Sequence, residues 1–129
     1  MQILQPPDWA RPKGFSNGIA ASGRLVFIAG QVGWTGQGEW REKSFAGQFR
    51  QALANILSVL KEANGGPEHI VRLTWYVLDK REYLAAVKDI GAAYRELMGR
   101  HYPAMAVVQV SGLVEDQARL EIEATAVIP

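Results

Sequence analysis

Apolar residues recur at spacings of three and four between Ser44 and Asn64, which is the period of an amphipathic helix. Ser44 is a suitable N-cap residue, because its hydroxyl can accept a hydrogen bond from a free backbone N–H group of the first turn. Asn64-Gly65-Gly66-Pro67 should end the helix, since glycine accepts the left-handed backbone conformation and proline cannot continue a helix. The expected apolar stripe comprises Phe45, Phe49, Ala52, Leu53, Ile56, Leu57, Leu60 and Ala63.

Four segments have the composition of β-strands. Residues 25–29 are an apolar run closed by Gly30, and residues 104–110 are small or β-branched. In 70–78 and 118–128 the side chains alternate, so each strand should bury one face. In residues 70–78 the face expected to be buried consists of Val71, Leu73, Trp75 and Val77, and the opposite face carries Arg72, Thr74 and Tyr76. In residues 118–128 the corresponding face consists of Leu120, Ile122, Ala124 and Ala126, and the opposite face carries Arg119, Glu121, Glu123 and Thr125.

A second helix is predicted after Asp79. Asp79 and Glu82 have the spacing of a capping box, in which Asp79 caps the helix and Glu82 reaches back to it. Its apolar stripe is Tyr83, Val87, Ile90, Tyr94 and Leu97, and Gly99 ends it. At the other end of the chain, residues 1–13 contain three prolines and predict an extended arm, followed by a predicted edge strand within 15–22.

The order of these elements predicts a single α+β domain spanning residues 1–129, with a mixed sheet of five to six strands. Two helices can cover only one face of such a sheet. The other face must contact water or another copy of the chain, and it carries Tyr76 and small or β-branched residues beside its charges. We therefore expect a homo-oligomer that packs sheet faces together, with a monomer that keeps a solvated face as the alternative.

Composition narrows the functional classes. The 129 residues carry a net charge of +1 and no basic stripe, which argues against nucleic acid or an anionic membrane as a partner. The chain has no cysteine, so disulfides, thiol nucleophiles and Cys-ligated metals are excluded. No apolar run is long enough to span a membrane, and residues 1–12 lack the pattern of a signal peptide. These features predict a soluble cytoplasmic domain.

Few residues suggest chemistry by themselves. His69 and His101 lie far apart and have no partner at metal-ligand spacing, so we expect capping or solvated histidines and no metal site. Glu121 and Glu123 share a strand face about 7 Å apart, as in an acid/base pair or a solvated face with a salt bridge. Arg72 could form such a bridge. Two loop tryptophans, Trp34 and Trp40, could cover the core or line a ligand cleft.

An ordered set of motifs resembles the Rid superfamily of imine and enamine deaminases, also labelled L-PSP endoribonucleases. The motifs are Phe27-Ile28-Ala29-Gly30-Gln31, Gln48 with Ala52-Leu53-Ala54-Asn55-Ile56, Asn64-Gly65-Gly66, Tyr102-Pro103-Ala104 and Leu120-Glu121-Ile122-Glu123-Ala124. The resemblance implies a chorismate-mutase-like fold and a homotrimer whose sheets line a central barrel, with a cleft at each subunit interface. It also implies cofactor-free hydrolysis of a 2-imino or enamine acid to a 2-oxo acid and ammonia.

Carried over residue by residue, the match is partial. Glu121 corresponds to the glutamate that positions the attacking water, and Gly30, followed by Gln31, corresponds to a substrate-holding glycine. The family's carboxylate-binding arginine, however, is replaced by Met105, and its early tyrosine by Phe15. Gly91 stands where the family often has asparagine.

These replacements change the expected substrate. Methionine cannot compensate the desolvation of a carboxylate, so we do not expect efficient hydrolysis of small imino acids such as 2-aminoacrylate. A cleft containing Phe15, Trp34, Trp40 and Met105 would be apolar and roomy, with backbone near Val107 orienting the ligand. Either the ligand is larger and less charged, or a cation comes from another position, Arg72 or Arg24.

Two functions remain open for such a protein. The first is a divergent enzyme that hydrolyses a larger imine or enamine metabolite and loses activity in Glu121→Ala. The second is a non-catalytic trimer that binds small molecules or proteins, in which Glu121→Ala is silent. The ribonuclease label of relatives is disfavoured by the charge and by the absence of a catalytic histidine pair.

Overall fold

The computed structural model describes residues 1–129 and contains six strands, three helices and one 3-10 turn. The strands are β1 (Gln2–Leu4), β2 (Gly18–Ala20), β3 (Arg24–Gln31), β4 (Ile70–Val77), β5 (Ala104–Gln109) and β6 (Leu120–Ile128). The helices are α1 (Phe45–Lys61), α2 (Lys80–Ala85) and α3 (Val87–Met98), with η1 (Pro67–His69) before β4. The expected α+β class is therefore confirmed.

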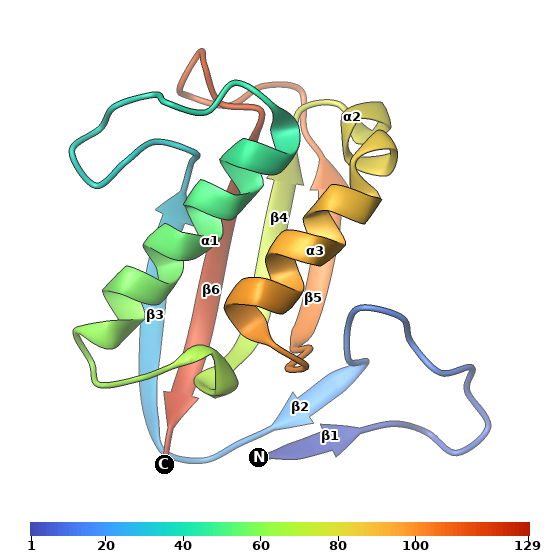
Figure 1. Cartoon of the computed structure of the whole chain (residues 1–129). Helices are drawn as coiled ribbons and strands as arrows, with labels where there is room; N and C mark the ends of the chain where they lie inside the picture. The colour runs from blue at the N-terminus through green and yellow to red at the C-terminus, as the bar shows by residue number, and fades with distance from the viewer.

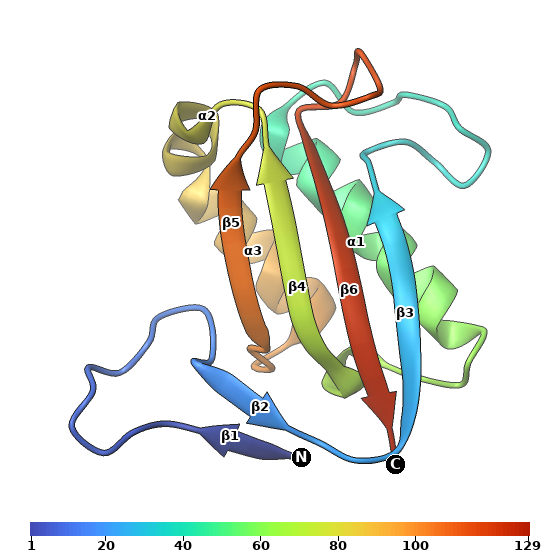
Figure 2. The ribbon, with the colours of Figure 1, turned by 180° about the vertical axis from the view of Figure 1, so that it is seen from behind.

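Four of the strands form one mixed sheet in the order β3-β6-β4-β5. β6 runs antiparallel to both β3 and β4, whereas β5 runs parallel to β4 at the edge. Both main helices, α1 and α3, cross the same face of this sheet (Figure 1). Seen from behind, the other face carries no helix (Figure 2). The sequence-based inference of one covered and one bare face is confirmed.

Helix α1 follows its predicted stripe. The Ser44 hydroxyl accepts a hydrogen bond from the N–H of Gly47 at 3.0 Å, as expected of an N-cap. The residue that takes the left-handed conformation after the helix is Asn64, with φ 61°, and not one of the two glycines. Asparagine is the residue most tolerant of this conformation after glycine. The end of the helix was therefore predicted correctly, but the residue that adopts the left-handed conformation was not.

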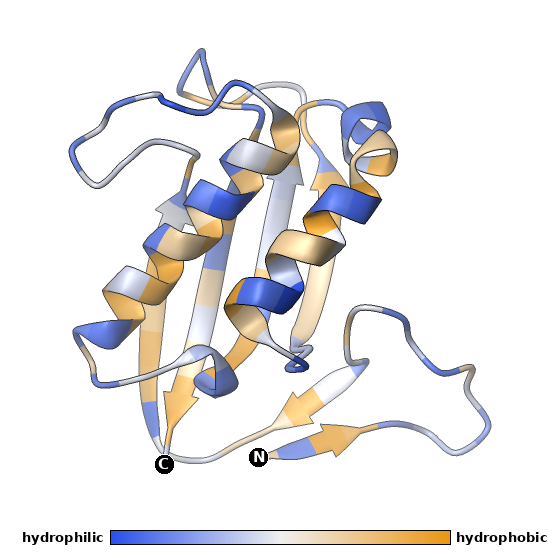
Figure 3. Ribbon diagram, viewed as in Figure 1, coloured by the Kyte–Doolittle hydropathy of each residue, from blue (hydrophilic) through white to orange (hydrophobic).

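The core lies between the two helices and the sheet. Apolar and polar residues alternate along the ribbons of α1 and α3 (Figure 3), and the buried residues of both helices are nearly all apolar. At its centre the rings of Phe49 and Trp75 stack at 4.7 Å. A β-bulge between Ile70 and Arg72 shifts the register at the start of β4, so Ile70 is buried and Val71 only half-buried. From Leu73 onwards the alternation holds.

The second predicted helix is divided in two. α2 ends at Ala85, with Ala86 as its C-cap, and α3 begins at Val87, so the predicted stripe from Tyr83 to Leu97 is shared by two helices. The predicted capping box was wrong in one half. Asp79 caps the N–H of Arg81, but the Glu82 carboxylate does not return to Asp79 and instead forms an ion pair with Arg119.

The N-terminal residues form a separate small unit. β1 pairs antiparallel with β2, and this two-stranded sheet lies beside the end of the main sheet (Figure 1). The prediction of one mixed sheet of five to six strands was therefore wrong, because the N-terminal strands pair with each other and leave four strands in the main sheet. Ser16 joins the unit to β5, because its N–H donates to the carbonyl of Pro103 at 3.0 Å. This contact places Phe15 beside the start of β5.

Candidate functional site

A cavity of about 590 Å³ opens between α3, β5 and the segment around Phe15. Phe15, Met105 and Val107, three residues predicted to bind substrate, all line it. Met105 and Val107 point to the helical side of the sheet, because they are in register with the buried Leu73 and Trp75 of β4. The cavity therefore lies on the same side of the sheet as the core.

Aromatic rings form most of the remaining wall. Trp75 is held by Phe49 on one side and meets Tyr83 edge-on at 5.9 Å. Tyr94 and Tyr102 stack at 5.2 Å, and the Tyr94 hydroxyl donates to the carbonyl of His101 at 2.6 Å. Burial raises the pKa of Tyr94, so this phenol stays protonated. The wall is rigid and apolar, which suits a ligand with an aromatic or branched body.

Two cations, Lys13 and Arg95, also line the cavity, and no carboxylate does. Arg95 lies one turn after Gly91 on α3 and folds back over it. A side-chain carbon at position 91 would come within 3.3 Å of the Arg95 Nη1 atom. The glycine thus leaves room for the guanidinium beside the cavity.

Glu121 forms a second group with Gly30. The two residues lie on adjacent strands, β6 and β3, and the Glu121 carboxylate rests on the backbone of Gly30. A side-chain carbon at position 30 would overlap Oε2 and Cδ of that carboxylate. The pairing of glutamate and glycine that the sequence suggested is therefore close in space.

Gln31 and Trp34 line a different hollow, of about 600 Å³, between the loop after β3 and helix α1. Trp40 packs against Trp34 at 5.6 Å between ring centroids. Asn55 fixes the loop by donating to the carbonyls of Val32 and Trp34. Trp34 and Gln31 therefore lie in a hollow separate from the cavity of Met105, and Trp40 packs against Trp34.

The two arginines proposed to replace the missing cation lie elsewhere. Arg72 is on the bare face of the sheet and shares a smaller hollow of about 300 Å³ with Phe15 and Met105 at the start of β5. Arg24 donates to the carbonyl of Ala63 at 2.8 Å, near the end of α1. Neither lines the large cavity.

The two groups of predicted residues lie on opposite faces of the sheet. Met105 and Val107 face the helices, whereas Glu121 alternates with the buried Leu120 and Ile122 and faces the bare side. Strand β4 separates β5 from β6. One chain therefore does not bring the Glu121 carboxylate and the Met105 cavity together.

Comparisons with known proteins agree with the motifs. The family model described as endoribonuclease L-PSP matches residues 9–128. A RutC family protein of Synechocystis sp. is 33% identical over 132 residues, covering 100% of this chain and 98% of the relative. A 2-iminobutanoate/2-iminopropanoate deaminase of Capra hircus is 32% identical over 105 residues, covering 81% of this chain and 73% of the relative.

The solved structures show the same relationship. A protein of unknown function of the Rid family from Yersinia pestis, YyfB, superposes with a TM-score of 0.86 at 32% identity over 98% of both chains. The chain belongs to the Rid superfamily.

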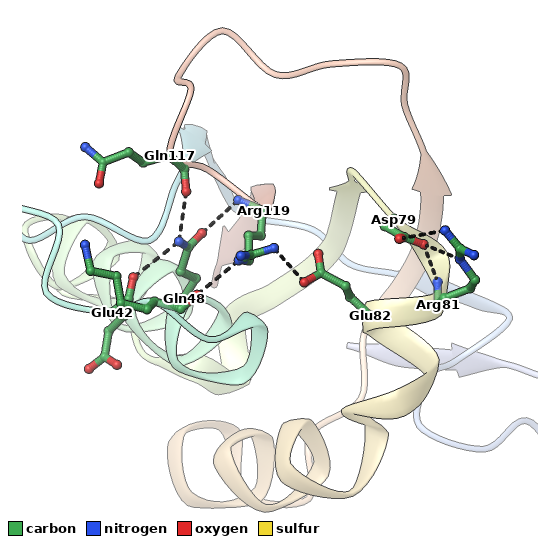
Figure 4. Close-up of polar contacts among 8 residues, drawn as sticks. Glu42, Gln48, Asp79, Arg81, Glu82, Gln117 and Arg119 are labelled. Carbon is green, nitrogen blue, oxygen red and sulfur yellow. Dashed lines mark hydrogen bonds and ion pairs between the residues drawn. The ribbon is translucent and has the colours of Figure 1, made fainter.

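In this Rid protein a buried glutamine holds the strand that carries Glu121. The Gln48 side chain donates to the carbonyls of Glu42 and Gln117, and it accepts from the N–H of Arg119 at 2.8 Å (Figure 4). Arg119 in turn donates to Lys43 and pairs with Glu82 at 2.7 Å (Figure 4). The start of β6 is thereby fixed to both α1 and α2.

The histidines of the Rid protein have structural contacts. His69 Nδ1 accepts from the N–H of Gly66 at 2.9 Å, and His101 Nε2 lies 2.6 Å from the Ile70 carbonyl. No three His, Asp or Glu side chains converge as they would around a metal ion. None of the helices combines the length and apolar character needed to cross a membrane.

Sequence reasoning missed the part of the cavity that α3 contributes. Gly91, Tyr94 and Arg95 share one side of α3 with Ile90, and helical spacing places them together. That spacing was used only to find the apolar stripe. Tyr102 belongs to a family motif but was not assigned to the site, and Lys13 carried no comparable signal because it reaches the cavity only through the fold.

Proposed function

We propose that this Rid protein hydrolyses an imino acid larger than 2-aminoacrylate, at a cleft formed between two copies of the chain in a homotrimer. The observation that carries the proposal is the separation of Met105 and Glu121 on opposite faces of one sheet. A site that uses both residues needs the cavity of one copy and the carboxylate of another. The relative named 2-iminobutanoate/2-iminopropanoate deaminase supports the reaction class.

The reaction needs only water as co-reactant. Glu121 takes a proton from the water as the water oxygen bonds to C2 of the protonated imine, which gives a carbinolamine. Glu121 then passes this proton to the amino nitrogen, the carbon–nitrogen bond breaks, and the hydroxyl group loses its proton to the departing ammonia. The imine nitrogen leaves as ammonia, and the former water oxygen becomes the keto oxygen of a 2-oxo acid. Gly30 leaves space for the Glu121 carboxylate on the bare face of the sheet. No cofactor or metal ion enters these steps.

The bare face supports the oligomer. Phe27 and Leu25 on β3 are 75% and 58% exposed in one chain. Large apolar side chains grouped on an open sheet face favour burial against a second copy. The expected partners are therefore other copies of this chain and a small-molecule metabolite, with no role for nucleic acid or membrane, and we expect the trimer in the cytoplasm.

The substrate size follows from the cavity. Met105, Val107 and Phe15 offer apolar surface where the family pattern has an arginine, so a three-carbon acid gains little there. We expect slow release of pyruvate from 2-aminoacrylate generated in situ, compared with a relative that has the arginine. A comparable rate in the two proteins would contradict the proposed specificity.

The deciding experiment uses Glu121→Gln and a panel of imines made by amino acid oxidases. We expect 2-oxo acid release above the uncatalysed rate with bulky imines, and its loss in Glu121→Gln. Glu123→Gln, on the same strand face, is the matched control and should keep activity. If no imine is turned over faster with the wild type than without it, the second candidate, a ligand-binding trimer, is favoured by the loss of the arginine.

A further inference from the structure

We propose that Arg95 binds the carboxylate of the ligand and that the cavity beside it takes an aromatic side chain. The ligand class is an aromatic 2-imino or 2-oxo acid. Turnover of such a ligand rests on the proposed function, but binding does not. The cation that the family pattern places on β5 would thus be supplied in this chain from α3.

Arg95 is available for a ligand anion. Four other arginines, at positions 41, 50, 81 and 119, form ion pairs with Glu39, Glu96, Asp79 and Glu82. Arg95 forms no ion pair and no side-chain hydrogen bond, although Glu96 is its neighbour in sequence, because Glu96 binds Arg50 through two hydrogen bonds. Its planar guanidinium suits a carboxylate, which it can bind with two parallel hydrogen bonds.

The charge of the cavity selects an anion. Lys13 lies on the same lining as Arg95, and the wall contains no acidic side chain. A cationic rim above an apolar wall favours a ligand with a negative group at one end and an apolar body at the other.

The size and the aromatic lining of the cavity favour a ligand with an aromatic side chain. Tyr83, Tyr94, Tyr102 and Trp75 present rings to a space of about 590 Å³, which is far larger than a three-carbon acid. Aromatic rings gain most from stacked or edge-on contact with another ring. A phenyl or indole side chain fills this space better than a methyl group does.

Gly91 belongs to the same arrangement. The loss of a side chain at this position lets the Arg95 guanidinium lie over the helix toward the cavity, where any larger residue would meet Nη1. Met105 thus leaves the strand without a cation at the cavity, and Gly91 leaves room on the helix for the Arg95 guanidinium.

The test is binding of phenylpyruvate and pyruvate to the full-length protein, measured by calorimetry. We expect phenylpyruvate to bind at least tenfold more tightly than pyruvate. Arg95→Ala should weaken phenylpyruvate binding about tenfold or more, and Arg95→Lys should weaken it less. Arg100→Ala, an exposed arginine just after α3, and Arg72→Ala are the controls and should bind as the wild type does.

Three results would overturn the proposal. They are equal affinity for the two acids, unchanged binding in Arg95→Ala, and loss of binding in Arg72→Ala with Arg95→Ala unaffected. Glu121→Gln separates this inference from the proposed function. If Glu121→Gln binds phenylpyruvate normally and Arg95→Ala does not, the ligand site stands even when the wild type hydrolyses no imine.

Discussion

The carboxylate of Glu121 lies against the backbone of Gly30 on the neighbouring strand, with no room for a side chain between them. Glu121 lies on β6 and Gly30 near the end of β3, where a β-bulge between Ile28 and Gln31 changes the register. The bulge and the glycine together open a space at the sheet edge that the carboxylate occupies. The position of the Glu121 carboxylate, the proposed water-activating group, therefore depends on the absence of a Cβ atom at Gly30.

Gly30→Ala should move the Glu121 carboxylate. The backbone at Gly30 is ordinary, and the overlap involves the end of a flexible side chain, so we expect the free energy of unfolding to change by less than about 1 kcal/mol. Turnover should fall about 100-fold, because displacements near 1 Å of a catalytic group have such effects. Gly112→Ala, where a Cβ meets nothing, is the control. Equal activity of both variants would show that the contact is irrelevant.

Gly91→Ala should separate stability from binding. Alanine stabilises a helix interior by about 0.5–1 kcal/mol relative to glycine, and the exposed Arg95 can shift by the few tenths of an ångström required. The free energy of unfolding should therefore rise while phenylpyruvate affinity falls. Ala92→Gly is the mirror control, with lower stability and unchanged affinity. A stabilised Gly91→Ala protein with full affinity would contradict the placement of the guanidinium.

Gln48→Ala should be among the more destabilising single substitutions. The side chain is 2% exposed and joins the carbonyls of Glu42 and Gln117 to the N–H of Arg119. Removing it leaves three part-buried backbone groups without their partner, and we expect a loss of about 3 kcal/mol in urea unfolding. Gln117→Ala keeps the carbonyl that Gln48 uses, so it should unfold at nearly the wild-type urea concentration. If Gln48→Ala and Gln117→Ala unfolded at similar urea concentrations, the three hydrogen bonds of the Gln48 side chain would not hold the start of β6.

The hydrogen bond between Tyr76 and Glu123 on the bare face should make the stability of the protein depend on pH. Its hydroxyl donates to Glu123 Oε1 at 2.6 Å, and this hydrogen bond to a carboxylate raises the pKa of Tyr76 above the ordinary value of 10.0. The folded state thus favours the protonated phenol. The contribution of this bond to stability is fully present below pH 10 and is lost as the pH rises through the folded-state pKa.

Titration of tyrosinate absorbance measures this shift. The wild type should show one more late-ionising tyrosine than Tyr76→Phe, and Glu123→Gln should return the pKa of Tyr76 toward its ordinary value. An unchanged titration curve in Glu123→Gln would mean that the hydrogen bond does not form in solution.

The periodicity of hydrophobic residues was enough to predict the helices and strands that keep one period along their whole length. The alternation of β6 was predicted correctly, and so was most of the stripe of α1, because each packs one face on the core. The stripe missed the buried Gln48 and included Ala63, which lies beyond the helix. Prediction failed where tertiary contacts compete with local ones. Glu82 has the spacing of a capping box, yet Arg119 comes within 2.7 Å of it and takes the carboxylate.

The candidate site was less accessible to sequence reasoning. Motifs indicated Glu121, Gly30, Phe15 and Met105, but each motif describes one segment. The cavity combines the N-terminal segment, β4, α2, α3 and β5, and only the fold shows that Arg95 belongs to it. An exposed arginine on a helix has no feature in the sequence that separates it from a solvated one.

The claim that one site is shared between two copies is tested most directly by mixing two inactive variants. Gly91→Trp fills the cavity and keeps Glu121, whereas Glu121→Gln keeps the cavity and loses the acid. Each variant alone should remain oligomeric by light scattering and release no phenylpyruvate from its imine above background. After joint unfolding and refolding in equal amounts, about a quarter of the interfaces pair two intact halves, and about a quarter of wild-type activity should return. Mixed oligomers that form but stay as inactive as their components would contradict the shared site.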